Sequence, residues 1–251
     1  MLDAEQDSGL AGFLWQGKQY EGLMCVALEV LRSNGTDLWS GDRDRAEYGL
    51  QFLRETISTY RITPLSTSMA DEESTRWIFG EGHALFMRNW PYAWSMFQQE
   101  GSPVRGKVGV VPLPSFSGFT SAPVLGGWML AMPNSSTHRE VVGELIQFLT
   151  SSDTQRMIAI ELGYNPVRRA LYVDESLLEL RPLLKDLYPI LLSAQPRPVT
   201  PYYLLLSQAV QPELSAVVVG RKSPAEALDA IRRRVDQIMG DQASPAGLGR
   251  S

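Results

Sequence analysis

Short apolar runs and long amphipathic stretches alternate along this chain of 251 residues. The apolar runs at 83–87, 108–111 and 127–132 each border on a glycine or a proline, which is typical of buried β-strands. Between these runs, apolar residues recur every three or four positions, which is the period of an amphipathic helix. The sequence therefore predicts a helix-rich fold with a few separated short strands, of the α/β or α+β class.

Capping residues mark where most of the predicted helices begin. Asp, Asn, Ser and Thr side chains satisfy the free backbone N–H groups of a first helical turn, and a Glu three residues later completes a capping box. The expected N-terminal signals are Asp42 or Asp44, Asp71, Asn89, Thr137 with Glu140, Asp153, and Ser223 with Glu226. The helices predicted from these signals and from the apolar period cover residues 20–33, 42–60, 71–79, 137–150, 153–163, 202–219 and 223–239. A further helical pattern at 175–192 is expected to be interrupted at Pro182 and Pro189.

The run at 83–87 is expected to lead directly into a helix that Asn89 caps. The first turn of that helix carries three aromatic residues, Trp90, Tyr92 and Trp94. Aromatic side chains at a junction between a strand and a helix lie at the edge of a sheet, where α/β folds place their ligands. This junction is therefore the first candidate for a binding site.

Composition excludes several classes of function. The net charge of −5 argues against a nucleic-acid or anionic-membrane partner, because both require a basic face. Cys25 is the single cysteine, so an internal disulfide is excluded, and it is expected to be a small buried hydrophobic residue. The two histidines, His83 and His138, leave little material for a zinc site, and no cofactor is expected.

The sequence also predicts neither a membrane span nor a signal peptide. A spanning helix needs about 18 or more predominantly apolar residues, and no stretch reaches that length. The first residues lack the basic region followed by an apolar region that marks a secretory signal.

Four blocks of sequence, in this order along the chain, carry a resemblance to a known family. They are Trp15–Leu23, Arg88–Trp94, Leu125–Trp128 and Arg197–Tyr202. Together they resemble the solute-binding proteins of ABC sugar importers, and specifically the trehalose/maltose-binding branch of the maltose-binding-protein-like family (family 1). The resemblance extends to about residue 240.

The resemblance implies a fold, a function and a set of partners. The fold would be α/β and periplasmic-binding-protein-like (class II), a two-lobed clamp that closes on its ligand by hinge bending. The protein would bind a sugar, such as the α-linked disaccharides trehalose and maltose, and deliver it to the membrane subunits of an ABC importer. It would be an extracytoplasmic monomer, periplasmic or anchored as a lipoprotein, with no enzymatic activity, no cofactor, no nucleic acid and no membrane insertion of its own.

The same resemblance implies a division of the chain between two lobes. Residues 1–110 would form the first part of the C-terminal lobe, 111–172 would cross to the N-terminal lobe, and 173–240 would return as helices. Residues 241–251 are expected to form a disordered tail. Most of the N-terminal lobe of the family would precede this chain, so that the run at 127–132 would lack neighbouring strands and leave an exposed edge.

Aromatic and glycine residues are the leading candidates for contact with the sugar. A sugar offers an apolar face, which stacks on flat aromatic rings, and Trp90, Tyr92 and Trp128 match family positions that touch sugar. The alternative is that these three are core aromatics. Gly126 and Gly127 would let the backbone approach the ligand closely, or would simply form a tight turn.

Polar candidates complete the predicted site. Arg197, held between two prolines, can donate several hydrogen bonds to sugar hydroxyls, although a surface salt bridge would also explain it. Weaker candidates for ligand contact are Gln16, Tyr20, Tyr202 and Tyr203. The remaining tryptophans are assigned to packing: Trp15, Trp39, Trp77 and Trp94.

Two other functions remain as alternatives. A glycoside hydrolase needs two carboxylates at a suitable separation, and Glu72, Glu73 and Glu81 are available. None of these three lies in an apolar setting that would raise its pKa, which argues against catalysis. The other alternative is a truncated interaction module that binds no ligand.

Overall fold

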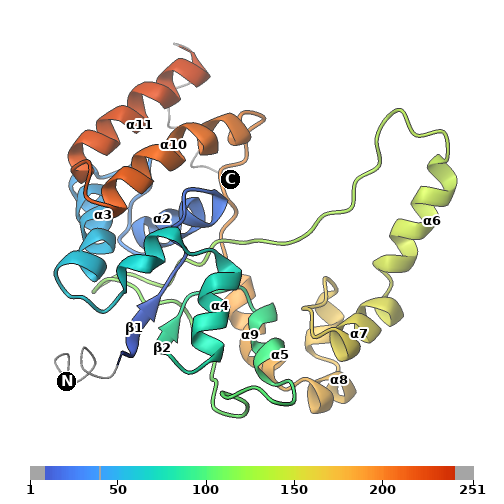
Figure 1. Cartoon of the computed structure of the whole chain (residues 1–251). Helices are drawn as coiled ribbons and strands as arrows, with labels where there is room; N and C mark the ends of the chain where they lie inside the picture. Colours follow the sequence, from blue (N-terminus) through green and yellow to red (C-terminus); the bar gives the residue numbers. More distant parts are fainter. Residues whose placement is uncertain (1–8, 40, 241–251) are drawn as a thin grey trace. The chain divides into compact units, whose positions relative to one another are not determined.

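The computed structural model describes residues 9–39 and 41–240, and the predicted tail at 241–251 lies outside the described residues. The chain divides into two compact units (Figure 1). Unit 1 consists of the described parts of Met1–Asn89, Pro112–Val124 and Ala194–Ser251. Unit 2 consists of Trp90–Val111 and Leu125–Ser193.

Unit 1 combines a small sheet with five α-helices and one 3-10 turn. The elements are β1 (Ala11–Leu14), α2 (Glu21–Arg32), α3 (Arg43–Ser58), η1 (Leu65–Met69), α4 (Glu72–Gly80), β2 (Ala84–Met87), α10 (Tyr203–Val218) and α11 (Pro224–Met239). All five α-helices were predicted, with boundaries that differ by a few residues at most. The capping signals at Asp42, at Asp71 and in the Ser223–Glu226 capping box are confirmed.

The sheet of unit 1 pairs β1 and β2 in parallel, with Phe13 opposite Phe86. The predicted strand at 83–87 is thus confirmed as β2, but its expected burial is wrong, because Leu85 is 46% exposed and Phe86 is 65% exposed. A pair of strands leaves more of its surface uncovered than a strand inside a wide sheet does. The partner strand β1 is not among the sequence predictions.

Four helices form the core of unit 1. α2 packs against α3 and α10, and α10 packs along α11 (Figure 1). α2 is buried on almost every side over 22–29, and Cys25 lies within this segment at 1% exposure, as expected for a small buried hydrophobic residue. This helix therefore lies at the centre of the helical core, between α3 and α10.

Unit 2 contains shorter helices joined by long irregular segments. The elements are α5 (Tyr92–Phe97), α6 (Arg139–Leu149), α7 (Ser152–Glu161), η2 (Arg169–Tyr172), α8 (Glu175–Leu180) and α9 (Leu183–Ser193). Its core cluster consists of Ala159, Leu171, Tyr172, Leu177 and Leu184, and Tyr188 stacks on Tyr172.

Two predicted strands of unit 2 are wrong. Residues 108–111 and 127–132 are irregular, and no strand of unit 2 is found among the described residues. A strand is held by backbone hydrogen bonds to a neighbour, and an apolar run without such a neighbour stays irregular. Met129 and Leu130 are accordingly 90% and 54% exposed.

Three predicted caps near unit 2 are also wrong. α6 begins after His138 without a side-chain cap, so Thr137 and Glu140 form no capping box. α7 is capped by Ser151, whose hydroxyl accepts a hydrogen bond from the N–H of Thr154, and not by Asp153. Before α5, the capping position belongs to Pro91, while the Asn89 amide instead donates to the carbonyl of Glu72 in unit 1. At α7 and α5 a neighbouring residue in the sequence takes the capping position that was assigned to Asp153 and Asn89.

The unit boundaries differ from those of the predicted lobes. Residues 90–110 were assigned with the first part of the chain but cluster with unit 2, while 112–124 cluster with unit 1. The assignment of these segments to the lobes of a clamp stays a prediction. Among the described residues, no helix is both long enough and apolar enough to cross a bilayer.

Candidate functional site

In unit 2, the backbone at Gly126 lies against the ring of Trp90. A Cβ atom at position 126 would lie 2.7 Å from the Trp90 ring, so a side chain there would require the ring to shift. No atom lies within 4 Å of the equivalent point on Gly127, so close packing explains only the first glycine of the pair. The sequence analysis named Trp90 and Gly126 as candidates for one site but did not predict that they touch. In the structure these two residues, 36 positions apart, lie against each other.

Trp128 is the most exposed large apolar residue in the described part of unit 2, with a relative exposure of 102%. The alternative that it is a core residue is therefore wrong. Tyr92 is the first residue of α5 and is partly buried. Trp94 is also partly buried, and its indole N–H donates to the carbonyl of Val108 at 3.3 Å, which supports its assignment to packing.

In unit 1, Arg197 is held by a carboxylate that sequence reasoning missed. Its Nη1 donates to Oε1 of Glu21 at 2.8 Å, and its guanidinium lies 5.7 Å from the centre of the Tyr203 ring. The hydroxyls of Tyr203 and Ser207 donate to the two oxygens of the same carboxylate, each at 2.5 Å. Tyr202, the neighbouring candidate, is 46% exposed.

The charges in this cluster affect one another. Burial raises the pKa of the Tyr203 hydroxyl, and the hydrogen bond to Glu21 raises it further. Burial alone would lower the pKa of Arg197, but the hydrogen bond to Glu21 and the electrostatic attraction of Cys25, Tyr203 and Glu21 together outweigh it, so that the pKa lies above its usual value. Both shifts keep Arg197 positively charged and Tyr203 neutral at physiological pH.

Tyr20 lies just before α2 in a second polar group of unit 1. Its hydroxyl donates to Glu72, and its ring occupies the space that a side chain at Gly22 would need. Burial, followed by the hydrogen bond to Glu72, raises the pKa of Tyr20. Trp77 on the adjacent helix α4 is 63% exposed, so its assignment to packing is wrong, whereas Trp15 and Trp39 are buried as expected.

Gln16 is fully buried, and its amide is used inside the protein. Its Nε2 donates to the Thr75 hydroxyl and to the carbonyl of Arg88, and its Oε1 accepts from Nη1 of Arg88. We therefore place Gln16 as a support for its neighbours and not at a surface that a ligand reaches.

Arg88 and Glu29 form a buried ion pair beside Gln16. Two nitrogens of Arg88 donate to the two carboxylate oxygens of Glu29 at 2.8 and 2.9 Å, and the side chains are 4% and 8% exposed. Glu29 also accepts a hydrogen bond from the N–H of Val124. Burial opposes the charge of Arg88, but Glu29 outweighs it and holds the pKa of the guanidinium above its usual value.

Sequence reasoning missed these charged residues, although a signal was present. Glu29 interrupts an otherwise apolar stretch of α2, and Arg88 follows directly after the apolar run of β2. A charge inside an apolar helix is rarely buried without a partner. Glu21, at the start of α2, gave no comparable signal because acidic residues are common in a first helical turn.

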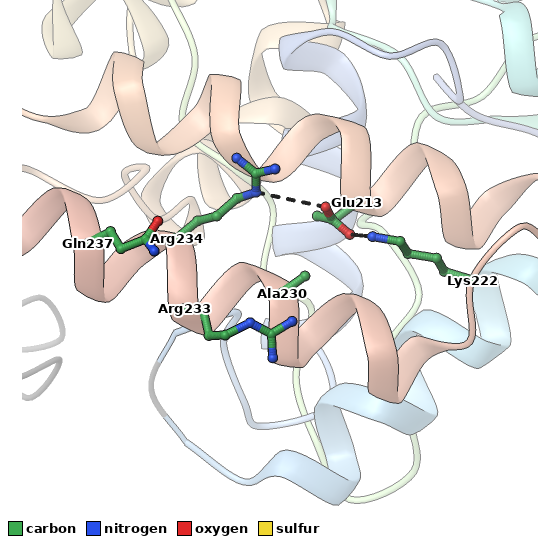
Figure 2. Close-up of a pocket in the computed structure, with 6 residues that line it drawn as sticks. All are labelled: Glu213, Lys222, Ala230, Arg233, Arg234 and Gln237. Carbon is green, nitrogen blue, oxygen red and sulfur yellow. Dashed lines mark hydrogen bonds and ion pairs between the residues drawn. The ribbon is translucent and has the colours of Figure 1, made fainter.

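An open polar hollow lies between α10 and α11, and none of the predicted site residues lines it (Figure 2). Glu213 of α10 pairs there with Lys222 and, at 3.9 Å, with Arg234 of α11. The lining residues are Glu213, Lys222, Ala230, Arg233, Arg234 and Gln237. Because none of them is aromatic, the hollow lacks a stacking platform for a sugar, and its ion pairs serve to join the two helices.

Comparison with known proteins identifies the family. The family model described as bacterial extracellular solute-binding protein matches residues 4–177. The chain belongs to this family. A probable ABC transporter-binding protein of Deinococcus radiodurans is 34% identical to this solute-binding protein over 239 residues, which are 91% of this chain and 56% of the relative.

Solved structures agree with this assignment. The maltose-bound MalE3 of T. maritima is 38% identical, with a TM-score of 0.88 over 94% of this chain and 63% of the other. A solute-binding protein from Thermotoga lettingae bound with α-D-tagatose is 23% identical, with a TM-score of 0.81 over 94% of this chain and 61% of the other, and supports the fold alone. The resemblance and the periplasmic-binding-protein-like fold are confirmed. The chain spans less than two thirds of the length of these relatives.

Proposed function

We propose that this solute-binding protein binds a sugar, an α-linked disaccharide such as maltose or trehalose, and delivers it to the membrane subunits of an ABC importer. The observation that carries the proposal is the exposed indole of Trp128, close in sequence to the glycine that lies against Trp90. An exposed indole presents a large apolar surface to water, about 150–250 Å², and stacking on a sugar face would cover it. The 38% identity to a maltose-bound protein supports the choice of ligand.

Polar donors would fix the orientation of the sugar. Arg197 keeps two guanidinium nitrogens, Nε and Nη2, that donate no hydrogen bond within the described residues. Sugar hydroxyls accept such bonds, and a charged donor strengthens them. Tyr92, Tyr20, Tyr202 and Tyr203 remain proposed contacts, and each combines a flat ring with a hydroxyl.

We propose binding without catalysis. A glycoside hydrolase needs one carboxylic acid with a raised pKa and a second carboxylate near it. Glu21 instead accepts three hydrogen bonds from its neighbours, and Glu72 accepts one from Tyr20. Carboxylates held in this way serve as structural acceptors. The proposed setting is extracytoplasmic, with the protein acting as a monomer beside its transporter.

Titration of tryptophan fluorescence tests the proposal. Maltose, trehalose and sucrose are added separately to the chain and to its Trp128→Ala variant. We expect a saturable change with an α-linked disaccharide, at least tenfold weaker in W128A because the stacking platform is lost. Trp77→Ala is the matched control, since Trp77 is also exposed but belongs to unit 1, and its binding curve should keep the wild-type midpoint.

A specific feature favours a second candidate, an interaction module without a ligand. α6 has no buried residue, and its apolar side chains Val141, Leu145 and Phe148 are each more than half exposed. Such a face is typical of protein contacts. A folded sample that responds to none of the three sugars, and that associates through α6, would favour this candidate over sugar binding.

A further inference from the structure

Glu21 joins three other side chains of unit 1 at one carboxylate. It is the first residue of α2, Arg197 lies on the proline-flanked loop, and Tyr203 and Ser207 belong to α10. Three donors from two segments, the loop and α10, therefore meet one acceptor group on α2. The arrangement fixes the position of Arg197, whose long side chain could otherwise adopt many rotamers.

From this geometry we infer that Glu21 is a positioning residue for ligand binding, which acts by holding the guanidinium of Arg197 and the ring of Tyr203. The inference rests on the proposed function, in which Arg197 donates to sugar hydroxyls. A free arginine side chain loses conformational entropy when it is ordered. Because Glu21 already binds Nη1, that ordering occurs on folding and not on ligand binding.

The contacts of Glu21 also determine which atoms are offered to a ligand. With Nη1 engaged at 2.8 Å, the nitrogens Nε and Nη2 are the ones left for hydroxyl acceptors. A third of the Arg197 side chain is exposed to solvent. Stacking of the guanidinium over Tyr203, at 5.7 Å, restrains the plane in which they lie.

The binding test is a double-mutant cycle on Glu21 and Arg197, with maltose as the probe. We expect E21A to weaken binding about tenfold, the effect of losing one charge-assisted contact, and E21Q to retain part of the affinity because its amide oxygen still accepts a hydrogen bond. In an R197A background, E21A should cost less than it does in the wild-type chain, because only the part that acts through Tyr203 is left to lose. The control is E81A, since Glu81 is an exposed carboxylate of the same unit.

Additive losses in the cycle would overturn the inference, because they would mean that Glu21 acts independently of Arg197. A general loss of stability would lower the melting temperature of E21A and E81A alike. It would not make the losses of maltose affinity in E21A and R197A non-additive. If E21A does not fold, the E21Q variant carries the same comparison with a smaller expected loss.

A measurement without ligand separates this inference from the proposed function. The Nε–Hε signal of Arg197, assigned with R197K, reports the order of the side chain in ¹⁵N NMR relaxation. We expect an ordered signal in the wild-type chain that becomes mobile in E21A. If Arg197 becomes mobile in E21A but the wild-type chain binds no sugar, only the proposed function is refuted. If Arg197 stays ordered in E21A, the positioning role of Glu21 is refuted.

Discussion

Helices α11 and α6 have the same kind of sequence and opposite surroundings. Each carries an apolar face and a polar face, as the spacing of its residues predicts. In unit 1, α11 buries Leu228, Ile231 and Val235 among its neighbours. In unit 2, α6 leaves Val141 and Leu145 mostly exposed. The comparison shows that an amphipathic pattern predicts a helix and its apolar face, but not whether anything covers that face.

The largest expected effect concerns the charged centre of unit 1. We expect Arg88→Ala to lower the free energy of unfolding by about 3–5 kcal/mol, because it leaves the buried Glu29 carboxylate without its cation. Urea unfolding measures this change. Lys18→Ala is the control, since its pair with Asp71 is exposed and should contribute at most about 1 kcal/mol. Equal effects of the two variants would show that unit 1 does not depend on a buried charge.

The comparison of α11 with α6 is tested directly with two leucines. We expect Leu228→Ala to destabilise the protein by about 2–5 kcal/mol, because a fully buried side chain leaves a cavity. Leu145→Ala, at 53% exposure, should change stability by no more than about 0.5 kcal/mol. Calorimetric unfolding of both variants checks the contrast. A large loss in L145A would mean that the α6 face is covered in solution.

Helix caps should have a similar effect in both units because they act locally. Ser223→Ala in unit 1 and Ser151→Ala in unit 2 should each cost about 1 kcal/mol, since each hydroxyl satisfies a backbone N–H. Thr137→Ala is the control, because α6 has no side-chain cap. Thermal unfolding followed by circular dichroism distinguishes these outcomes. Destabilisation by T137A would mean that Thr137 caps α6 in solution, contrary to the structure.

The smallest effect is expected from acid. The Ser176 hydroxyl, the N–H of Leu177 and Arg156 lower the pKa of Asp174 in unit 2 to about 2, and Lys18 and Ser74 lower the pKa of Asp71 in unit 1 to about 2. Each depressed pKa adds stability above the unfolded value of about 4, and this stability is lost as the pH falls from about 4 to 2.

Unfolding midpoints in urea, measured between pH 6 and 2, follow this loss. The D174N and D71N variants should each show a weaker dependence on pH below 4 than the wild-type chain. Because both carboxylate side chains are partly exposed, at 32% and 34%, the difference should be slight and should shrink in high salt. A pH dependence that neither variant alters would place the acid-sensitive groups elsewhere.

Part of the fold could be predicted because its causes are local. The caps at Asp71 and Ser223 act within one helical turn, and the helix boundaries they imply are confirmed. The strands at 108–111 and 127–132 failed because a strand exists only through a partner, which local sequence does not supply. The same reason explains why β1 was missed.

The candidate site shows the same division. Trp90, Trp128 and Arg197 were singled out by residue type and by family resemblance. Sequence reasoning missed Glu21, because its importance lies in contacts with α10 and with a loop far along the chain. Gln16 was placed at the ligand, yet its burial beside Arg88 makes it a support.

The sequence by itself determined the helices, their apolar faces, the exclusion of a disulfide and the membership of a solute-binding family. These follow from spacing, from capping chemistry and from blocks of residues that lie next to one another in the chain. Only the tertiary structure decided that Glu29 pairs with Arg88, that Trp90 lies against Gly126 and that α6 is bare while α11 is covered. The physical reason is that burial and charge pairing depend on contacts between segments far apart in sequence, and these arise only when the chain folds.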